Sequence, residues 1–248
     1  MPTLLYYSSI LDGSNTYYPG KVCSVIFLGG CPLRCPWCYV PALMTRNNSI
    51  PAQVKFFVDH FREHSDSEAA CITGGEPLEQ GDAVLELCKA LKEEGVLVKL
   101  ETSGFFPDAL ASVLPFVDRI SFDYKTALDL DSYFKATGAR GSPLTIITNV
   151  IRSLEAVKKS SGIFKEFRTT IVPGLNDRPE IVEAIASNIP FADSYVLQQF
   201  RSDLELNDGL YQGLPSTSKE LLLSLAGIAK KHVKNVSVST IDEGEMKV

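Results

Sequence analysis

KVCSVIFLGGCPLRCPWCYV, residues 21–40, joins a strand-like run directly to three closely spaced cysteines. Residues 21–28 are rich in β-branched and aromatic side chains and end at a pair of glycines, which predicts a strand followed by a turn. The cysteines then lie in the loop after that strand, at Cys31, Cys35 and Cys38. Ligands of parallel α/β proteins bind at the carboxyl ends of strands, so this loop is the first candidate functional site.

Strand-like and helix-like stretches alternate along the rest of the chain. The further expected strands are 69–73, 96–102, 119–124, 164–172, 194–200 and 236–240. Helical periodicity separates most of them, and pairs spaced as in a capping box, Asp177 with Glu180 and Thr217 with Glu220, predict two helix starts. Repeated strand-then-helix units favour a parallel sheet with right-handed crossovers.

The expected fold is therefore α/β, a partial (β/α)6 TIM-like barrel, because about six strand-then-helix units, with a long loop after the first strand, fit a partial barrel better than a full eight-fold one. An open doubly wound sheet is the alternative. No repeat or low-complexity linker divides the 248 residues. We expect one domain, 1–248, with a core over about 21–200 and a C-terminal helix and strand within 217–240.

Composition excludes several function classes. The hydrophobic fraction is 45%, and the formal net charge of -6 is dispersed, so no basic face indicates nucleic acid. No apolar run suits a signal peptide or a membrane span, which predicts a cytoplasmic protein. In a reducing compartment, clustered cysteines are more often metal ligands or redox groups than disulfides.

Unusual polar residues follow the other expected strands as well. Since the carboxyl ends of parallel strands share one edge of a sheet, we expect these residues to form one site with the cysteines. They are Gly74, Gly75, Glu76, Glu101, Thr102, Ser103, Asp123, Lys125, Arg168, Gln198 and Gln199. Arg168 is the hardest to explain otherwise, because a charge within an apolar strand needs an anionic partner.

Three clustered thiolates suit a metal site with an open position. Structural zinc normally takes four protein ligands, whereas a four-iron cluster with three cysteines leaves one iron free to bind a small molecule. A zinc site completed by Cys23 or Cys71, or a redox pair of Cys35 and Cys38, is the plainer alternative. Like Cys88, those other cysteines lie in apolar stretches and are expected to pack in the core.

The C-x3-C-x2-C spacing, with Trp37 before the last cysteine, resembles the signature of the radical S-adenosylmethionine (SAM) superfamily. GGEP at 74–77 is similar to the turn that binds the methionine amino group in that superfamily. The resemblance implies a 4Fe-4S cluster on the three cysteines that reductively cleaves SAM to a 5'-deoxyadenosyl radical. It also implies that Trp37, the 74–76 turn, Thr102 and Ser103 contact the cofactor.

Shorter stretches resemble the small glycyl-radical-enzyme activating proteins, in particular those of anaerobic ribonucleoside-triphosphate reductase. They are YYPGKVCSVIFLGG, ETSG, FDYK and FRTTIVPGLND, in that order. This resemblance implies cofactor contacts and a catalytic role for Lys125 and Arg168, cofactor contacts for Asp123, and a monovalent cation near Glu101, Thr102 and Asp123. Gln198 and Gln199 are expected to contact the cofactor because they close a strand at the same edge of the sheet. It implies a glycyl radical enzyme as protein substrate.

Two departures from the activase pattern affect the expected partners. Tyr39-Val40 stands where activases commonly have His-Asn, which puts the contacts to the partner loop in doubt. No second cysteine cluster follows Cys38, so we expect electrons from a separate flavodoxin or ferredoxin.

Two other function classes stay open: a small-molecule radical SAM enzyme of the 7-carboxy-7-deazaguanine synthase type, and a noncatalytic iron-sulfur electron carrier. One further pattern lies outside these motifs. His60 and His64 have the i, i+4 spacing of a metal-binding pair on a helix, but no third ligand accompanies them in sequence. A solvated helix face is the expectation there.

Overall fold

The computed structural model describes residues 3–64, 66–138 and 142–248. Contacts divide the chain into two compact units. The first comprises Met1–Pro32, Ala42–Ser121 and Asn149–Phe164, and the second comprises Leu33–Pro41, Phe122–Thr148 and Lys165–Val248. The expectation of one domain over 1–248 stays a prediction.

The first unit contains a mixed sheet in the order β5-β4-β2-β1-β3. Strands β2, β4 and β5 are parallel, and β1 is antiparallel to both β2 and β3. Their bounds are β1 Leu4–Ser14, β2 Cys23–Leu28, β3 Ile50–Gln53, β4 Ala69–Gly74 and β5 Leu97–Thr102. Leu28 pairs with Gly74, so the cysteine-bearing loop and the glycine turn leave the sheet side by side.

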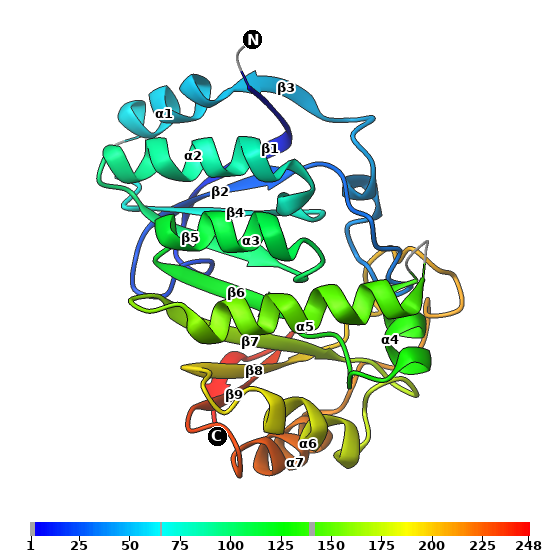
Figure 1. The fold of residues 1–248 in the computed structure, drawn as a ribbon. Coiled ribbons are helices and arrows are strands. Elements are labelled where there is room, and N and C mark those ends of the chain that lie inside the picture. The colour runs from blue at the N-terminus through cyan, green and yellow to red at the C-terminus, as the bar shows by residue number, and fades with distance from the viewer. Residues whose placement is uncertain (1–2, 65, 139–141) are drawn as a thin grey trace. The chain divides into compact units, whose positions relative to one another are not determined.

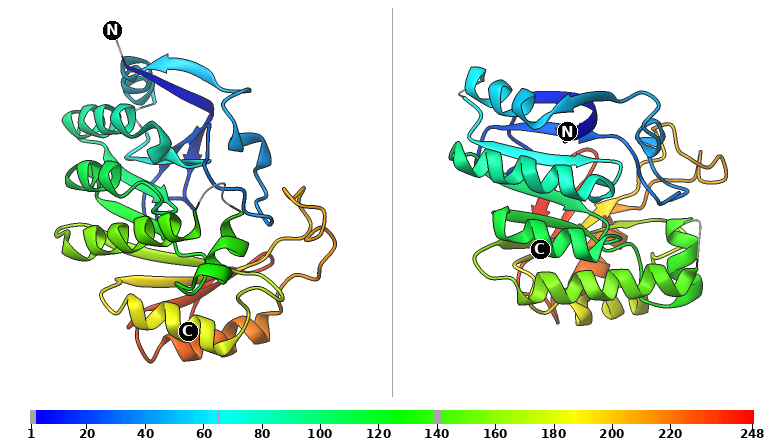
Figure 2. Two further views of the ribbon diagram at one scale, coloured as in Figure 1. Left: turned by 45° about the vertical axis from the view of Figure 1, so that its right-hand side comes forward. Right: turned by 45° about the horizontal axis from the view of Figure 1, so that its top comes forward.

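Helices α1 (Val54–Glu63), α2 (Gly81–Glu93) and α3 (Pro107–Val113) cover one face of these parallel strands (Figures 1 and 2). Helix α2 packs against both α1 and α3, and its buried stripe is Ala83, Val84, Leu87, Cys88 and Leu91. Short 3-10 turns connect the elements at η1 (Pro41–Met44), η2 (Pro77–Gln80) and η3 (Leu114–Phe116). Strand β6 (Arg119–Asp123) follows and runs across the boundary between the units.

The second unit continues with parallel strands β7, β8 and β9 and an antiparallel β10. Their bounds are β7 Phe164–Ile171, β8 Ser194–Gln199, β9 Val236–Thr240 and β10 Gly244–Lys247. The remaining helices are α4 Leu130–Thr137, α5 Pro143–Lys159, α6 Pro179–Asn188 and α7 Lys219–Ala229. Helix α7 packs against α6 and against β8 and β9 (Figure 1).

Most of the expected strands and helices are present, but several boundaries differ. The helix expected from Pro51 begins at Val54, because residues 50–53 form β3 and pair with β1. Strand β1 was not expected at all. Most of its side chains are partly or fully exposed, and its Gly, Asp and Ser residues are depleted in strands.

Both predicted capping boxes are wrong. Helix α6 begins after Arg178, while the carboxylate of Asp177 accepts a hydrogen bond from the amide of Gly174. Helix α7 is capped by Ser218, whose hydroxyl accepts from the amide of Leu221. The hydroxyl of Thr217 instead donates to the carbonyl of Ile171, a contact that no local spacing predicts.

Within the described ranges, the helices are all too short or too polar to cross a bilayer.

Candidate active site

The end of β2 and the end of β4 meet in the first unit. The amide of Gly75 donates to the carbonyl of Leu28 at 2.9 Å, and the amide of Glu76 donates to the carbonyl of Gly30 at 2.8 Å. A Cβ atom at Gly75 would lie 2.3 Å from the Gly30 oxygen, and one at Gly74 would lie 2.1 Å from the Leu28 oxygen. Both positions therefore require glycine, because the two backbone segments approach too closely for a side chain.

The backbone around Cys31 is held by the segment that follows the cysteine loop. The amide of Gly30 donates to the carbonyl of Leu43 at 2.9 Å, and the amide of Cys31 donates to the carbonyl of Met44 at 3.3 Å. Gly30 has a φ of 99°, which favours glycine. The sequence motifs around residues 30 and 75, distant along the chain, thus form one turn structure.

Glu76 is almost fully buried, with 1% of its surface exposed. Its Oε1 accepts from the amide of Leu78 and the hydroxyl of Thr102, and its Oε2 accepts from the amide and the hydroxyl of Ser103. Burial raises the pKa of this carboxyl, and these hydrogen bonds oppose the rise. A carboxylate has about four lone-pair sites, so the protein itself fills them. Glu76 therefore fixes the loop after β5 onto the glycine turn.

Glu101 has partners of its own. Its Oε1 lies 3.1 Å from the ammonium of Lys99, and its Oε2 accepts from the hydroxyl of Thr73 at 2.9 Å. Lys99 also donates to the carbonyl of Tyr17 at 2.6 Å. A cation of the chain thus already faces the carboxylate that was expected to bind a monovalent ion.

Cys35 and Cys38 lie in the second unit. The backbone carbonyl groups of their loop accept hydrogen bonds from residues outside the loop. The side chain of Asn207 donates to the carbonyls of Arg34 and Cys35 at 3.3 and 3.2 Å. The backbone amide of Asn207 donates to the carbonyl of Cys38 at 3.0 Å. The next amide, of Asp208, donates to the carbonyl of Pro36 at 3.0 Å. The segment after β8 therefore holds the cysteine loop in one conformation.

Helix α4 supports the same loop from its C-terminal end. The carbonyl of Thr137 accepts from the amide of Arg34 at 2.7 Å. Gly138 ends the helix in the left-handed conformation, and a Cβ atom there would lie 2.2 Å from the Arg34 oxygen. Neither α4 nor Asn207 was expected from the sequence. A glycine after the run LDSYFKAT was the available signal for the helix end.

Three charged residues at the ends of β6 and β7 form a cluster. The carboxylate of Asp123 lies 3.1 Å from the ammonium of Lys125 and 3.3 Å from Nε of Arg168. Burial disfavours the charge of Lys125, but Asp123 and the nearby Cys35 outweigh burial and raise the lysine pKa. Arg168 thus has the anionic partner that its position in an apolar strand requires.

The thiols of Cys35 and Cys38 have a higher pKa than free cysteine and so hold their protons more strongly. Burial raises the pKa of Cys35 to about 11, and Lys125 partly opposes this rise. Burial also raises the pKa of Cys38. Because thiolates are the metal ligands, a bound metal would have to displace these protons, and the ammonium of Lys125 favours that charge.

The other cysteines pack in the core, as predicted. Cys23 and Cys71 form a fully buried hydrophobic cluster with Val25 and Ala69. Cys88 is also fully buried, and burial raises its pKa to about 12. A closed zinc site completed by one of these residues is therefore disfavoured. Three remaining soft ligands, two of them near Lys125, fit an iron-sulfur cluster with one open iron.

A pocket of about 180 Å³ opens beside the cysteine loop in the second unit. Trp37, Gln198 and Gln199, all predicted site residues, line it together with Tyr39. The side-chain amide of Gln199 already has two partners within the protein. Its Nε2 donates to the carbonyl of Thr217 at 2.7 Å, and its Oε1 accepts from the backbone amide of Ile241 at 2.8 Å. Gln199 thus braces the pocket wall.

These features define an α/β protein whose cysteine loop and glycine turn follow the ends of parallel strands. Residues 25–185 match the family model of the Radical SAM superfamily. The chain belongs to this superfamily and is a radical SAM enzyme, as predicted.

Two relatives extend this assignment. A Methanocaldococcus jannaschii protein, whose name assigns it provisionally to the glycyl-radical enzyme activating enzymes, is 32% identical over 237 residues, which cover 95% of this chain and 96% of the relative. The pyruvate formate-lyase-activating enzyme of Clostridium pasteurianum is 28% identical over 67% of this chain and 68% of its own length.

Two further similarities are more limited. A 7-carboxy-7-deazaguanine synthase from Methanospirillum hungatei is 39% identical, but over only 39% of this chain and 38% of its own length. The solved structure of TYW1 with a lysine-pyruvate adduct matches with a TM-score of 0.62 at 15% identity, over 93% of this chain and 80% of that one. Together with the family match, this structural similarity confirms the predicted fold class.

Proposed function

We propose that this radical SAM enzyme installs a glycyl radical on a partner enzyme, such as an anaerobic ribonucleotide reductase. The observation that carries the proposal is the similarity to an activating-enzyme relative over 95% of the chain. The similarity thus extends well beyond the matched superfamily core, into the segment that holds the cysteine loop. A backbone glycine is a suitable target because the flanking amides delocalise a radical at its Cα.

Cys31, Cys35 and Cys38 would hold the 4Fe-4S cluster in this proposal. When bound, the cluster and SAM supply a 5'-deoxyadenosyl radical, which takes a hydrogen atom from the substrate. The polypeptide itself binds SAM and orients it. Carbonyl oxygens of the Gly74-Gly75 turn accept from the methionine amino group, because the amides of Gly75 and Glu76 are already bonded within the protein.

Lys125 and Arg168 of the charged cluster would attract the SAM carboxylate. Asp123 lies 3.1 Å from the ammonium of Lys125 and 3.3 Å from Nε of Arg168, and these ion pairs orient both side chains. Trp37 and Gln198 offer an aromatic face and an amide on one pocket wall, the contacts that suit a planar heterocycle. Each of these assignments is part of the proposal.

The electron donor and the cation complete the scheme. The cysteines outside the loop are buried in the core, so we propose that a flavodoxin or ferredoxin in the cytoplasm supplies the electron. The monovalent cation near Glu101, Thr102 and Asp123 stays a prediction, and Lys99 weakens the case for it. Equal SAM cleavage in potassium and choline buffers would remove the cation from the proposal.

The test has two stages. First, the anaerobically reconstituted and reduced enzyme should release 5'-deoxyadenosine and methionine, and Cys35→Ala should abolish both while Cys88→Ala retains them. Second, mixing with an anaerobic ribonucleotide reductase should produce a glycyl radical doublet in electron paramagnetic resonance. Absence of cleavage with a reduced cluster contradicts the enzyme assignment. Cleavage without a glycyl radical on any candidate reductase contradicts only the proposed target.

A small-molecule reaction is the second candidate, and the local similarity to a 7-carboxy-7-deazaguanine synthase favours it. In that case a small-molecule substrate, with no partner enzyme present, should stimulate 5'-deoxyadenosine release and be consumed in step with it. The two candidates are thus distinguished by which substrate couples to SAM cleavage.

A further inference from the structure

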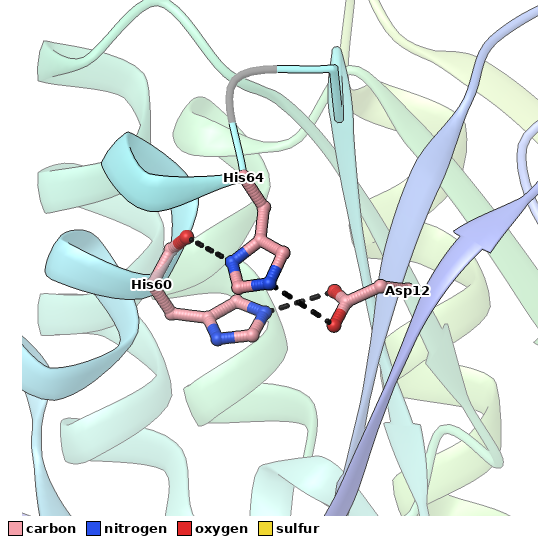
Figure 3. A group of neighbouring side chains, drawn as sticks. All are labelled: Asp12, His60 and His64. Atoms are coloured by element: carbon pink, nitrogen blue, oxygen red, sulfur yellow. Dashed lines mark hydrogen bonds and ion pairs between the residues drawn. The ribbon is translucent and has the colours of Figure 1, made fainter.

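Three metal-ligand side chains meet in the first unit, apart from the residues assigned to SAM. Asp12 extends from β1, and His60 and His64 lie at the C-terminal end of α1 (Figure 3). Nε2 of His60 is 2.8 Å from Oδ1 of Asp12, and Nε2 of His64 is 3.9 Å from Oδ2. The third ligand that the sequence pattern lacked is therefore supplied by a strand that the sequence did not predict.

The two imidazole rings are oriented before any ion binds. They stack with centroids 4.1 Å apart and planes 21° apart, and both direct Nε2 toward Asp12 (Figure 3). Nδ1 of His64 lies 2.9 Å from the carbonyl of His60. A carbonyl only accepts, so Nδ1 carries a proton, and Nε2 of a neutral His64 is left with a lone pair. This is the tautomer in which metal-binding histidines are usually held. Nε2 of His60 faces a carboxylate oxygen, which only accepts, so a bound ion would replace the proton at that nitrogen.

The carboxylate is supported by a second layer of hydroxyl groups. Ser24 donates to Oδ1 of Asp12 at 2.5 Å, and Ser24 is itself 2.7 Å from the hydroxyl of Ser67. Both serines are buried. Metal-binding carboxylates are typically hydrogen-bonded in this way, which fixes their direction.

The spacing of the ligand atoms suits a tetrahedral ion. With bonds of about 2.0–2.2 Å, two ligands of one zinc ion lie about 3.4 Å apart. The observed separations of 2.8 and 3.9 Å lie on either side of this value. In addition, the lone pair of His64 faces a carboxylate oxygen, and a cation between them would convert that repulsion into two bonds.

We propose that Asp12, His60 and His64 bind one divalent transition-metal ion of the zinc class, with water at the fourth position. Two imidazoles and a carboxylate suit Zn²⁺ or Co²⁺, whereas Mg²⁺ and Ca²⁺ prefer oxygen ligands. The ion connects the end of α1 to β1 and has no part in the radical reaction. The alternative is a metal-free ion pair between a protonated His64 and Asp12.

The test must keep zinc away from the cysteine loop. We would use two forms of the full chain: the anaerobic holoenzyme with its cluster loaded, and a variant with Cys31, Cys35 and Cys38 all changed to Ser. Each form is dialysed against buffered Zn²⁺, and bound zinc is counted by mass spectrometry. In the serine variant, Co²⁺ is also titrated, because four-coordinate Co²⁺ has strong visible absorption and no cluster obscures it.

The expected result is one zinc per chain in both forms, with a zinc-dependent rise in melting temperature. His64→Ala and Asp12→Asn should each weaken zinc binding at least tenfold and remove the Co²⁺ absorption. His232→Ala is the matched control, since it changes the third and last histidine and should leave binding unaltered. His64 is well exposed, so its replacement should not prevent folding.

Two results would overturn the proposal. One is zinc uptake that persists unchanged in His64→Ala and Asp12→Asn. The other is the absence of any zinc bound at 100-fold molar excess, which would establish the metal-free ion pair. Circular dichroism of each variant confirms that it is folded.

Discussion

At the scale of single residues, the carboxylate of Glu76 has all of its described hydrogen-bond partners within the protein. The four hydrogen bonds that its carboxylate accepts connect the loop after β5 to the turn after β4. Thr102 and Ser103 were both predicted to contact SAM, and their hydroxyl groups donate hydrogen bonds to this carboxylate. In the first unit, the turn proposed to contact SAM is therefore organised around a buried carboxylate.

Glu76→Gln should be costly for this reason. The amide of Gln would point a donor at groups that are themselves donors, leaving buried polar groups unsatisfied. We expect a loss of about 2–4 kcal/mol in the free energy of unfolding, because hydrogen bonds to a charged group contribute about 1.5–3 kcal/mol each. Urea denaturation of the apoprotein measures this loss in the free energy of unfolding.

Glu86→Gln is the control for this substitution. Glu86 is exposed on α2 and accepts from the hydroxyl of Thr3. Its replacement should change stability by less than about 0.5 kcal/mol. Equal costs for the two variants would contradict the role assigned to Glu76.

At the scale of elements, the cysteine loop depends on α4 and on the segment after β8. The carbonyl of Arg34 accepts from Asn207 and lies against Gly138 at the end of α4. Three elements that are distant in sequence thus define the backbone path between two of the cluster ligands.

Gly138→Ala should disturb this path. The new Cβ would lie 2.2 Å from the Arg34 oxygen, so the loop would have to move. We expect a fall in iron bound per chain after reconstitution, and a stability loss larger than the ~1 kcal/mol that a left-handed residue costs by itself. Iron analysis and thermal unfolding give the two quantities.

Gly162→Ala separates the cost of a left-handed alanine from the effect of the close approach to the Arg34 oxygen. Gly162 also has a positive φ, 76°, but a Cβ there meets nothing within 4 Å. It should lose about 1 kcal/mol and bind iron normally. If both variants load iron equally well, the close approach at Gly138 has no bearing on the cluster.

At the scale of the whole molecule, each unit has hydrophobic packing that does not involve the cluster ligands. In the first unit, Val84, Leu87 and Leu91 of α2 are fully buried, and in the second unit Leu222 and Leu225 of α7 are fully buried. A chain of about 250 residues buries more than 70% of its surface, so we expect its folding not to depend on a metal.

Removal of iron should therefore leave the fold intact. After anaerobic chelation, we expect unchanged far-ultraviolet circular dichroism and a cooperative thermal transition. The Cys35→Ala variant, which never binds the cluster, should match the chelated protein. A broad, noncooperative transition in either sample would show that the metal is needed for folding.

Local patterns account for much of what could be predicted. β-Branched runs such as 23–28 and periodic stretches such as α2 form their elements from their own residues, and strand ends then indicate the site. What was missed depends on distant partners. Strand β1 is specified by pairing with β2 and β3, and Asp12 therefore had no visible connection to His60. Likewise, no spacing rule connects Asn207 to Cys35, 172 residues earlier.

That separation has a consequence for biosynthesis. A polypeptide leaves the ribosome from its amino end, and the three thiols emerge long before Asn207 has been translated. The carbonyl groups beside them then lack their donors until the segment around Asn207 has emerged. We therefore expect an iron centre to reach its final geometry only after residue 207 has been translated.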